Sequence, residues 1–110
     1  MAETFKSNHV ALTTSNQDIV AAIAASTTAI VLSIRATNVD GTNDATVDVQ
    51  VVDTGGSPTA YIAKTISVPA DTSLELAGQS KLVLETGDKI QGLASADNDV
   101  EIFVSYLEIT

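Results

Sequence analysis

The sequence has no cysteine and no tryptophan, and it has only two prolines, five basic residues and one histidine among its 110 residues. Without cysteine, disulfides and thiol nucleophiles are excluded. A zinc site needs several His or Cys ligands, which a single histidine cannot supply. That residue, His9, lies in a polar N-terminal segment, a poor position for a catalytic base. We therefore predict a non-enzymatic protein that holds no cofactor.

Aromatic residues are also few, with two phenylalanines and two tyrosines. Clefts that hydrolyse glycosides pair two carboxylic acids with a sugar-binding surface, and such surfaces usually present aromatic rings. The chain also lacks the Gly-Lys-Ser/Thr sequence of a phosphate-binding loop. Two non-catalytic classes remain, an assembly component and a ligand-binding module.

Acidic residues outnumber basic ones by fourteen to five, which gives a formal net charge of −9. The basic residues are scattered singly, so the sequence indicates no nucleic-acid surface. The acidity either keeps the protein soluble or favours docking onto a basic partner. The uncharged run 19–34 is too short for a spanning helix and is interrupted by Ser26-Thr27-Thr28, so we expect a soluble protein with no membrane partner.

Alternation of apolar and polar residues with a period of two is the dominant pattern, and it is typical of β-strands. It is clearest in the stretch 29–53, where two alternating arms flank the turn-forming residues 38–44. We predict a β-hairpin there, with Ile30, Leu32, Ile34 and Ala36 on one face of its first arm. Similar runs recur about every ten residues, so the predicted fold is all-β, an antiparallel sandwich or jelly-roll-like barrel of about eight short strands.

The two ends of the chain differ from its middle. Residues 1–16 are polar with sparse apolar residues, and we predict an N-terminal arm or edge strand before a single β-sandwich domain at 17–110. The final strand is apolar on both faces, which indicates a central position or cover by another chain. The predicted interface residues are Phe5, Val10, Leu12, Phe103, Tyr106, Leu107 and Ile109.

Three segments are predicted turns, 38–44, 54–58 and 96–99. Two of them, 40–44 and 97–99, carry closely spaced carboxylates and amides, which are calcium ligands. Neither follows the EF-hand order, and Asp, Asn and Gly are also ordinary turn residues. We predict turns without a metal.

Five phrases carry a family resemblance: TTSNQDIV, TAIVLSIRATNVDGTNDATVDVQVVD, YIAKTISVPADTSLEL, KLVLETGDKIQGLAS and EIFVSYLEIT. Together they resemble small virion structural proteins of tailed bacteriophages, particularly marine and cyanobacterial phages. The resemblance implies a capsid decoration (cement) protein, often trimeric, that binds the major capsid protein or other virion proteins. It would be assembled in the host cytoplasm and reside in the virion. The alternative is a neck, tail or fibre component whose loops recognise a host glycan.

Overall fold

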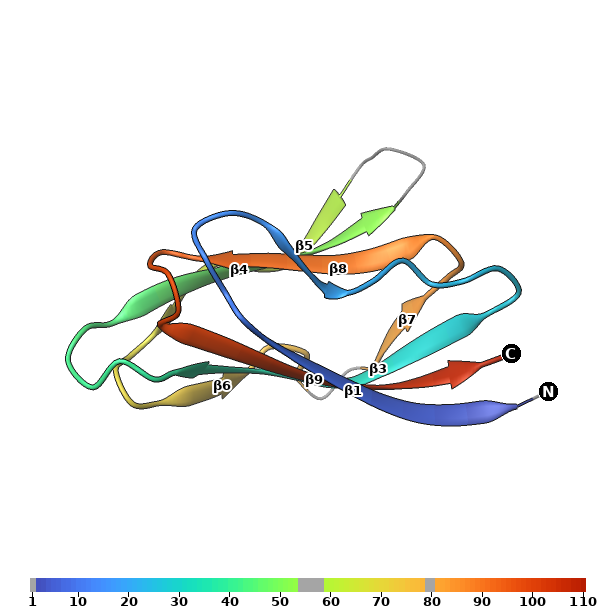
Figure 1. Cartoon of the computed structure of the whole chain (residues 1–110), viewed down its shortest axis with the longest axis horizontal. Coiled ribbons are helices and arrows are strands. Elements are labelled where there is room, and N and C mark those ends of the chain that lie inside the picture. Colours follow the sequence, from blue (N-terminus) through green and yellow to red (C-terminus); the bar gives the residue numbers. More distant parts are fainter. Residues whose placement is uncertain (1, 54–58, 79–80) are drawn as a thin grey trace.

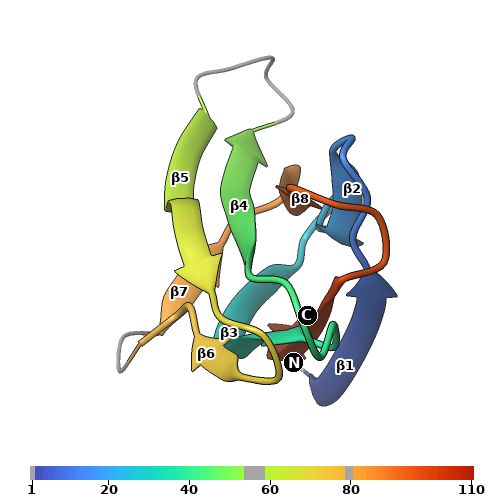
Figure 2. The same cartoon turned by 90° about the vertical axis from the view of Figure 1, so that its left-hand side faces the viewer.

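The computed structural model describes residues 2–53, 59–78 and 81–110, and within them the chain is built from strands (Figure 1). The described residues contain nine strands, which are β1 (Glu3–Ala11), β2 (Gln17–Val20), β3 (Thr28–Asn38), β4 (Ala45–Asp53), β5 (Thr59–Val68), β6 (Ser73–Glu75), β7 (Leu82–Leu84), β8 (Asp88–Ala94) and β9 (Val100–Ile109). They form two antiparallel sheets packed face to face (Figure 2). The predicted antiparallel β-sandwich is confirmed. No helix in the described part of the chain is long and apolar enough to cross a bilayer.

Sheet A contains β1-β9-β3-β6 in that order, with β7 also paired to β3, and sheet B contains β2-β8-β4-β5. Most connections therefore cross from one sheet to the other. The loops after β1, β3, β5 and β8 gather at one end of the sandwich and are joined there by backbone hydrogen bonds. The bonds run from Val39 N to Asp99 O (2.8 Å), from Asp71 N to Asp40 O (3.2 Å) and from Asn98 N to Leu12 O (2.8 Å).

The hairpin predicted at 29–53 is wrong, although both of its strands are present. β3 pairs with β6, β7 and β9 in sheet A, and β4 pairs with β5 and β8 in sheet B. Alternation shows that each arm has a buried face, but it does not show that the two arms pair with each other. The buried faces of two strands in opposite sheets can point into one core from opposite sides. The segment 39–44 crosses the roughly 10 Å between packed sheets. Asn38 holds this crossing from a fully buried position, since its amide donates to Asn43 O (3.0 Å) and Val68 O (2.9 Å).

The predicted face of β3 is also only half right. Ala29 and Val31 point inward at the start of the strand, and Ile34 and Ala36 point inward further along. The pairing register with β9 shifts between Val31 and Ser33, which identifies a β-bulge at Leu32. One extra residue reverses the order of inward and outward side chains. Ile30 therefore lies on the outer face instead of in the core.

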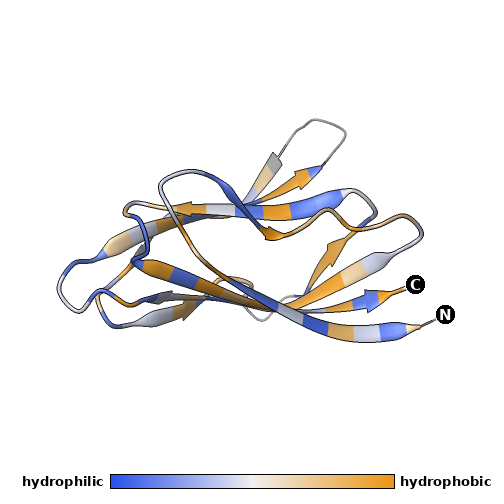
Figure 3. Ribbon diagram, in the orientation of Figure 1, coloured by the Kyte–Doolittle hydropathy of each residue, from blue (hydrophilic) through white to orange (hydrophobic). Residues whose placement is uncertain are grey.

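The core lies between the sheets and is aliphatic. Strand β9 contributes Val100, Ile102 and Val104, all without exposed surface, and it runs between β1 and β3. Of the two alternatives expected for the final strand, the central position is the one that the sheet shows. The hydropathy bands of Figure 3 alternate along the strands of both sheets, as expected where one face is buried.

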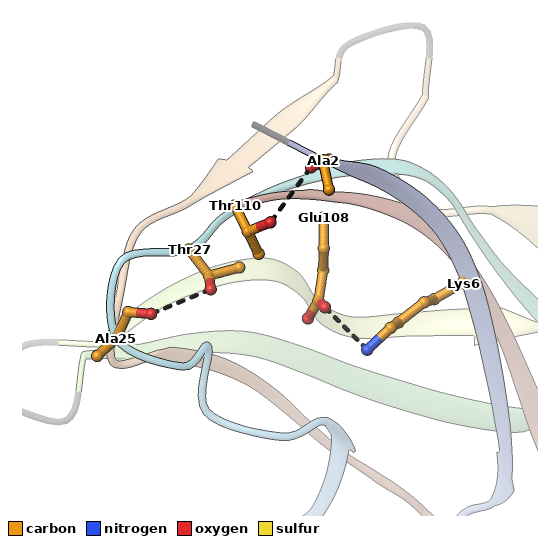
Figure 4. A network of polar contacts seen from close by, with 6 residues as sticks. All are labelled: Ala2, Lys6, Ala25, Thr27, Glu108 and Thr110. Atoms are coloured by element: carbon orange, nitrogen blue, oxygen red, sulfur yellow. Dashed lines mark hydrogen bonds and ion pairs between the residues drawn. The ribbon is translucent and has the colours of Figure 1, made fainter.

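The N-terminal segment, expected as an arm or an edge strand, contains β1, which lies at one edge of sheet A (Figure 2). It pairs with β9 in unbroken register from Glu3↔Ile109 to Ala11↔Glu101. Ala2 and Thr110 exchange backbone hydrogen bonds of 3.1 and 2.9 Å. Lys6 Nζ lies 2.8 Å from Glu108 Oε1 (Figure 4), and this partner raises the pKa of Lys6.

Candidate interaction surface

The outer face of sheet A carries an apolar row that crosses four strands. Phe5 of β1 pairs in register with Leu107 of β9, which pairs with Ile30 of β3, which pairs with Val83 of β7. Phe5 is 76% exposed and Val83 is 61% exposed, while Leu107 and Ile30 are half-buried between them. We call these four residues the apolar row. Aligned side chains on one face of a sheet make a continuous surface.

A second row on the same face combines an aromatic ring with charged groups. His9, Phe103, Arg35 and Glu75 are successive register partners, and Phe103 is 48% exposed. A row of three serines, Ser7, Ser105 and Ser33, separates the two rows.

Beside Phe103 the outer face is hollowed by about 290 Å³. The outward side chains that line this hollow come from β1, β3 and β9, and they are His9, Ala11, Thr37, Glu101 and Phe103. Its lining combines the small residue Ala11 with the rings of His9 and Phe103, so the hollow has room for an inserted apolar side chain.

The outer face of sheet B is different in kind. Its central row consists of Asp18, Gln91, Gln50 and Tyr61, of which Gln50 is buried. Gln91 Nε2 donates to Asp18 Oδ1 at 2.9 Å. Polar side chains here are paired with one another within the chain.

The basic residues of sheet B lie against acidic partners. Lys89 Nζ lies 3.6 Å from Asp18 Oδ1, and Lys64 Nζ lies 3.3 Å from Asp48 Oδ2. Lys64 Nζ also lies 4.7 Å from the centre of the Tyr61 ring, a cation–π contact. The hydrogen bond to Asp48 raises the pKa of Lys64.

The structure divides the predicted interface residues between the surface and the core. Phe5 and Phe103 are exposed on the outer face of sheet A, and Leu107 and Ile109 are half-buried on the same face. Leu12 is fully buried in the chain's own core, so its prediction as an interface residue is corrected. It was misplaced because a sparse apolar residue in a polar segment can anchor that segment inward as well as outward.

Val10 and Tyr106 are partly buried and pack against the core from the inner face of sheet A. Two members of the apolar row, Ile30 and Val83, were not predicted. Ile30 was not predicted because of the bulge at Leu32. Without a bulge, regular alternation assigns Ile30 to the same inward face as Ile34. The outward position of Val83 could have been predicted from the sequence, because Val83 stands between Leu82 and Leu84, whose side chains point inward.

The loop end of the sandwich holds the carboxylates that were considered as calcium ligands. The backbone N–H groups of Thr42 and Asn43 donate to Asp40 Oδ1 at 2.8 and 3.1 Å, and they lower the pKa of Asp40. Desolvation and the neighbouring Asp40 charge raise the pKa of Asp99. Within the described residues, no group of three or more His, Cys, Asp or Glu is arranged to hold a metal ion. The hydrogen bonds from Thr42 and Asn43 identify Asp40 as a turn residue. The predicted turn at 54–58 lies outside the described residues.

Neither a protein-family model nor a curated protein sequence matches the chain. Among solved structures, it is similar to the subunit of Bacillus endospore appendages, described as disulfide-linked pili. The TM-score is 0.57 and the identity 16%, over 99% of this chain and 87% of that one. This likeness concerns the fold.

Two viral structures are more distant. A pentameric capsid protein from metagenomic phage sequences gives a TM-score of 0.45 at 17% identity, over 93% of this chain and 59% of that chain. Infectious bursal disease virus gives 0.41 at 14% identity, over 96% of this chain and 28% of that chain. At these TM-scores the likeness carries no argument about role.

Proposed function

We propose that the protein is a non-enzymatic structural subunit of a phage virion, a capsid decoration (cement) protein that binds the outer surface of the head. The observation that carries the proposal is the outer face of sheet A. On a chain of net charge −9, this face presents the apolar row and Phe103 to solvent. Exposed apolar side chains that adjoin one another mark interaction surfaces.

The architecture is consistent with this role. The two antiparallel sheets, with strand orders β1-β9-β3-β6 (β7 also paired to β3) and β2-β8-β4-β5, resemble a jelly roll, a fold that occurs in viral capsid proteins. Fold alone does not determine function. The sequence phrases that resemble virion structural proteins supply the second line of support.

The proposal assigns opposite roles to the two outer faces. Sheet A faces the major capsid protein or another virion protein, and sheet B faces solvent. The polar pairs of sheet B, such as Lys89 with Asp18, are already formed within one chain. Because the chain has no cysteine, its assembly cannot use disulfides, unlike that of the disulfide-linked appendages to which its fold is similar. The family resemblance favours a homo-oligomer. The expectation of a trimer rests on that resemblance alone.

Imaging of intact particles tests the proposal. We expect hundreds of copies on the head, with sheet A turned toward the capsid. A few copies on the neck, tail or fibres would contradict decoration. That result would favour the alternative of an attachment component, in which loops such as 38–44 and 96–99 at one end of the sandwich contact a host glycan.

A further inference from the structure

The free edge of sheet A is formed by β1, and half of its backbone groups point away from the protein. In an antiparallel pair, alternate residues bond to the neighbouring strand. Ala2 exchanges hydrogen bonds with Thr110, and Leu12 N donates to Val100 O, so the even-numbered residues bond to β9. The backbone N–H and C=O groups of Glu3, Phe5, Ser7, His9 and Ala11 therefore line the free edge.

The other three sheet edges carry features that discourage pairing with a further strand. β6 and β7 have three residues each, and β2 has four with a register shift after Asp18. β5 contains register shifts and Thr65, whose φ of 51° is unusual for a β-branched residue. Short strands and bulges are the usual protection of edges. β1 has nine residues in unbroken register and no proline, so it lacks this protection.

We propose that a second copy of the chain pairs with β1 through its own β1, antiparallel and centred on Ser7. This register joins all nine residues of both strands and forms about ten backbone hydrogen bonds. It pairs Glu3 with Ala11, Phe5 with His9 and Ser7 with Ser7 of the second copy. Every one of these residues has its backbone groups on the free edge, as the ladder requires.

The charges of β1 agree with this register. The strand carries one Glu and one Lys, so it is neutral within a chain of net charge −9. Glu3 faces an alanine and Lys6 faces Asn8 of the second copy, so no like charges are directly opposed. Each Lys6 is already paired with Glu108 at 2.8 Å. A register centred on Lys6 would place the two lysines opposite each other, which is unfavourable.

The register also fits an exposed ring to the hollow. Phe5, the most exposed large apolar side chain in the described residues, lies near one end of β1. The hollow beside His9 and Phe103 lies near the other end. Antiparallel pairing about Ser7 places Phe5 opposite His9 of the second copy, in the same cross-strand row as that copy's Phe103. Each copy thus offers one ring and one hollow, as a two-fold contact requires.

The pairing would join the sheets A of two copies into one continuous sheet with one outer face. The expected oligomer is then a two-fold dimer instead of a trimer. This inference deepens the proposed function. It rests on that function only where it assumes that the joined face docks to a particle. The pairing itself is a property of the purified chain and is tested without particles.

Cysteine cross-linking tests the register, since the chain has no cysteine of its own. In the proposed pair the two Ser7 Cα atoms lie about 5.5 Å apart, within reach of a disulfide. We expect Ser7→Cys to form a covalent dimer on oxidation. Ala11→Cys is the matched control, because the two Ala11 residues lie at opposite ends of the paired strands. Equal cross-linking of both variants, or none at Ser7→Cys, would overturn the proposal.

Proline substitution tests the use of the edge. The N–H of Ser7 points away from β9, so Ser7→Pro removes a donor that only an added strand uses. By light scattering we expect a dimer for the unaltered chain and for Ser7→Ala, and a monomer for Ser7→Pro. Hydrogen exchange in β9 checks that Ser7→Pro remains folded. A monomeric or trimeric unaltered chain, or a folded dimeric Ser7→Pro, would refute the pairing.

The two proposals fail separately. A dimer that cross-links through Ser7→Cys but is absent from phage heads would remove the decoration role and leave the β1 pairing intact. The opposite result is a chain that binds heads but is monomeric in solution and gives no cross-link on the particle. It would remove the β1 pairing and leave the decoration role intact.

Discussion

The two sheets of this sandwich share one core and differ in what they show to solvent. Sheet A presents Phe5, Leu107, Ile30 and Val83 in one row, whereas the central row of sheet B is composed of Asp18, Gln91, the buried Gln50 and Tyr61. The inner faces of both are aliphatic. Inward residues are constrained by packing, but outward residues are not, so the outward ones are where function is expressed.

Charge sharpens this contrast. On sheet B the lysines are held by carboxylates of the same chain, and Lys64 also lies over Tyr61. On sheet A the apolar row contains no charged group, in a protein of net charge −9. Mutual repulsion between such acidic chains is weakest where their charges are fewest. The apolar row is therefore a favourable place for such chains to associate.

The largest expected effect comes from two isoleucines of β3 that face opposite ways. Ile34 is fully buried, so Ile34→Ala should lower the free energy of unfolding by about 2–5 kcal/mol. Ile30 lies in the apolar row, so Ile30→Ala should cost less than half as much and weaken particle binding instead. Chemical denaturation measures both. Equal costs would mean that the bulge at Leu32 is misplaced.

A single lysine on each outer face tests the comparison itself. Leu107→Lys places a charge in the apolar row, and we expect binding to phage heads assembled without the protein to weaken at least about tenfold. Gln91→Lys places the same charge on sheet B and should leave binding unchanged. Co-sedimentation with the heads measures both. Loss of binding in Gln91→Lys alone would assign the contact to sheet B.

A smaller effect is expected where sheet A is interrupted between β6 and β7. Ile34 N faces no strand there and donates to Glu75 Oε2 at 2.7 Å. Glu75→Ala leaves this amide without its acceptor and should cost about 1–2 kcal/mol in thermal or chemical unfolding. Glu75→Gln keeps an acceptor oxygen and should retain most of the stability. Identical losses in the two variants would show that the acceptor is unimportant.

The smallest effect concerns the loop carboxylates. The pKa of Asp99 is raised by desolvation and by Asp40, so the folded state holds its proton more tightly than the unfolded state and Asp99 opposes folding once it ionises. Asp99→Asn should therefore raise the melting temperature at neutral pH, and the gain should vanish below the ordinary pKa of 3.8.

Asp40 has the opposite sign. Its pKa is lowered by backbone N–H donors, so its contribution is present above the unfolded pKa and is lost as the pH falls through the folded one. That loss should remain in Asp99→Asn. Melting curves over acidic and neutral pH measure both trends, and a destabilised Asp99→Asn at neutral pH would contradict the assignment.

Local pattern predicted the strands and most turns, because apolar alternation reports directly on one-sided burial. It could not identify strand partners. The arms at 29–37 and 45–52 look like a hairpin in sequence, yet they belong to opposite sheets, because alternation is the same whether two strands pair or face each other across a core.

The residues of the candidate interaction surface could be predicted only in part, for a related reason. Phe5, Phe103, Leu107 and Ile109 lie on the outer face of sheet A, as regular alternation in β1 and β9 implies. Ile30 was missed because a one-residue bulge reverses the faces of a strand and leaves no mark in composition.

Hydroxyl-radical footprinting of the protein on phage heads tests the central claim most directly, since the chain has only four aromatic side chains to report on its surfaces. Phe5 and Phe103 are exposed on sheet A, and Tyr61 is 51% exposed on sheet B. We predict that oxidation of Phe103 falls sharply on binding, below its level in the free dimer, while Tyr61 stays as reactive as in the free protein. Protection of Tyr61 with unchanged Phe103 would contradict the assignment of sheet A as the contact face.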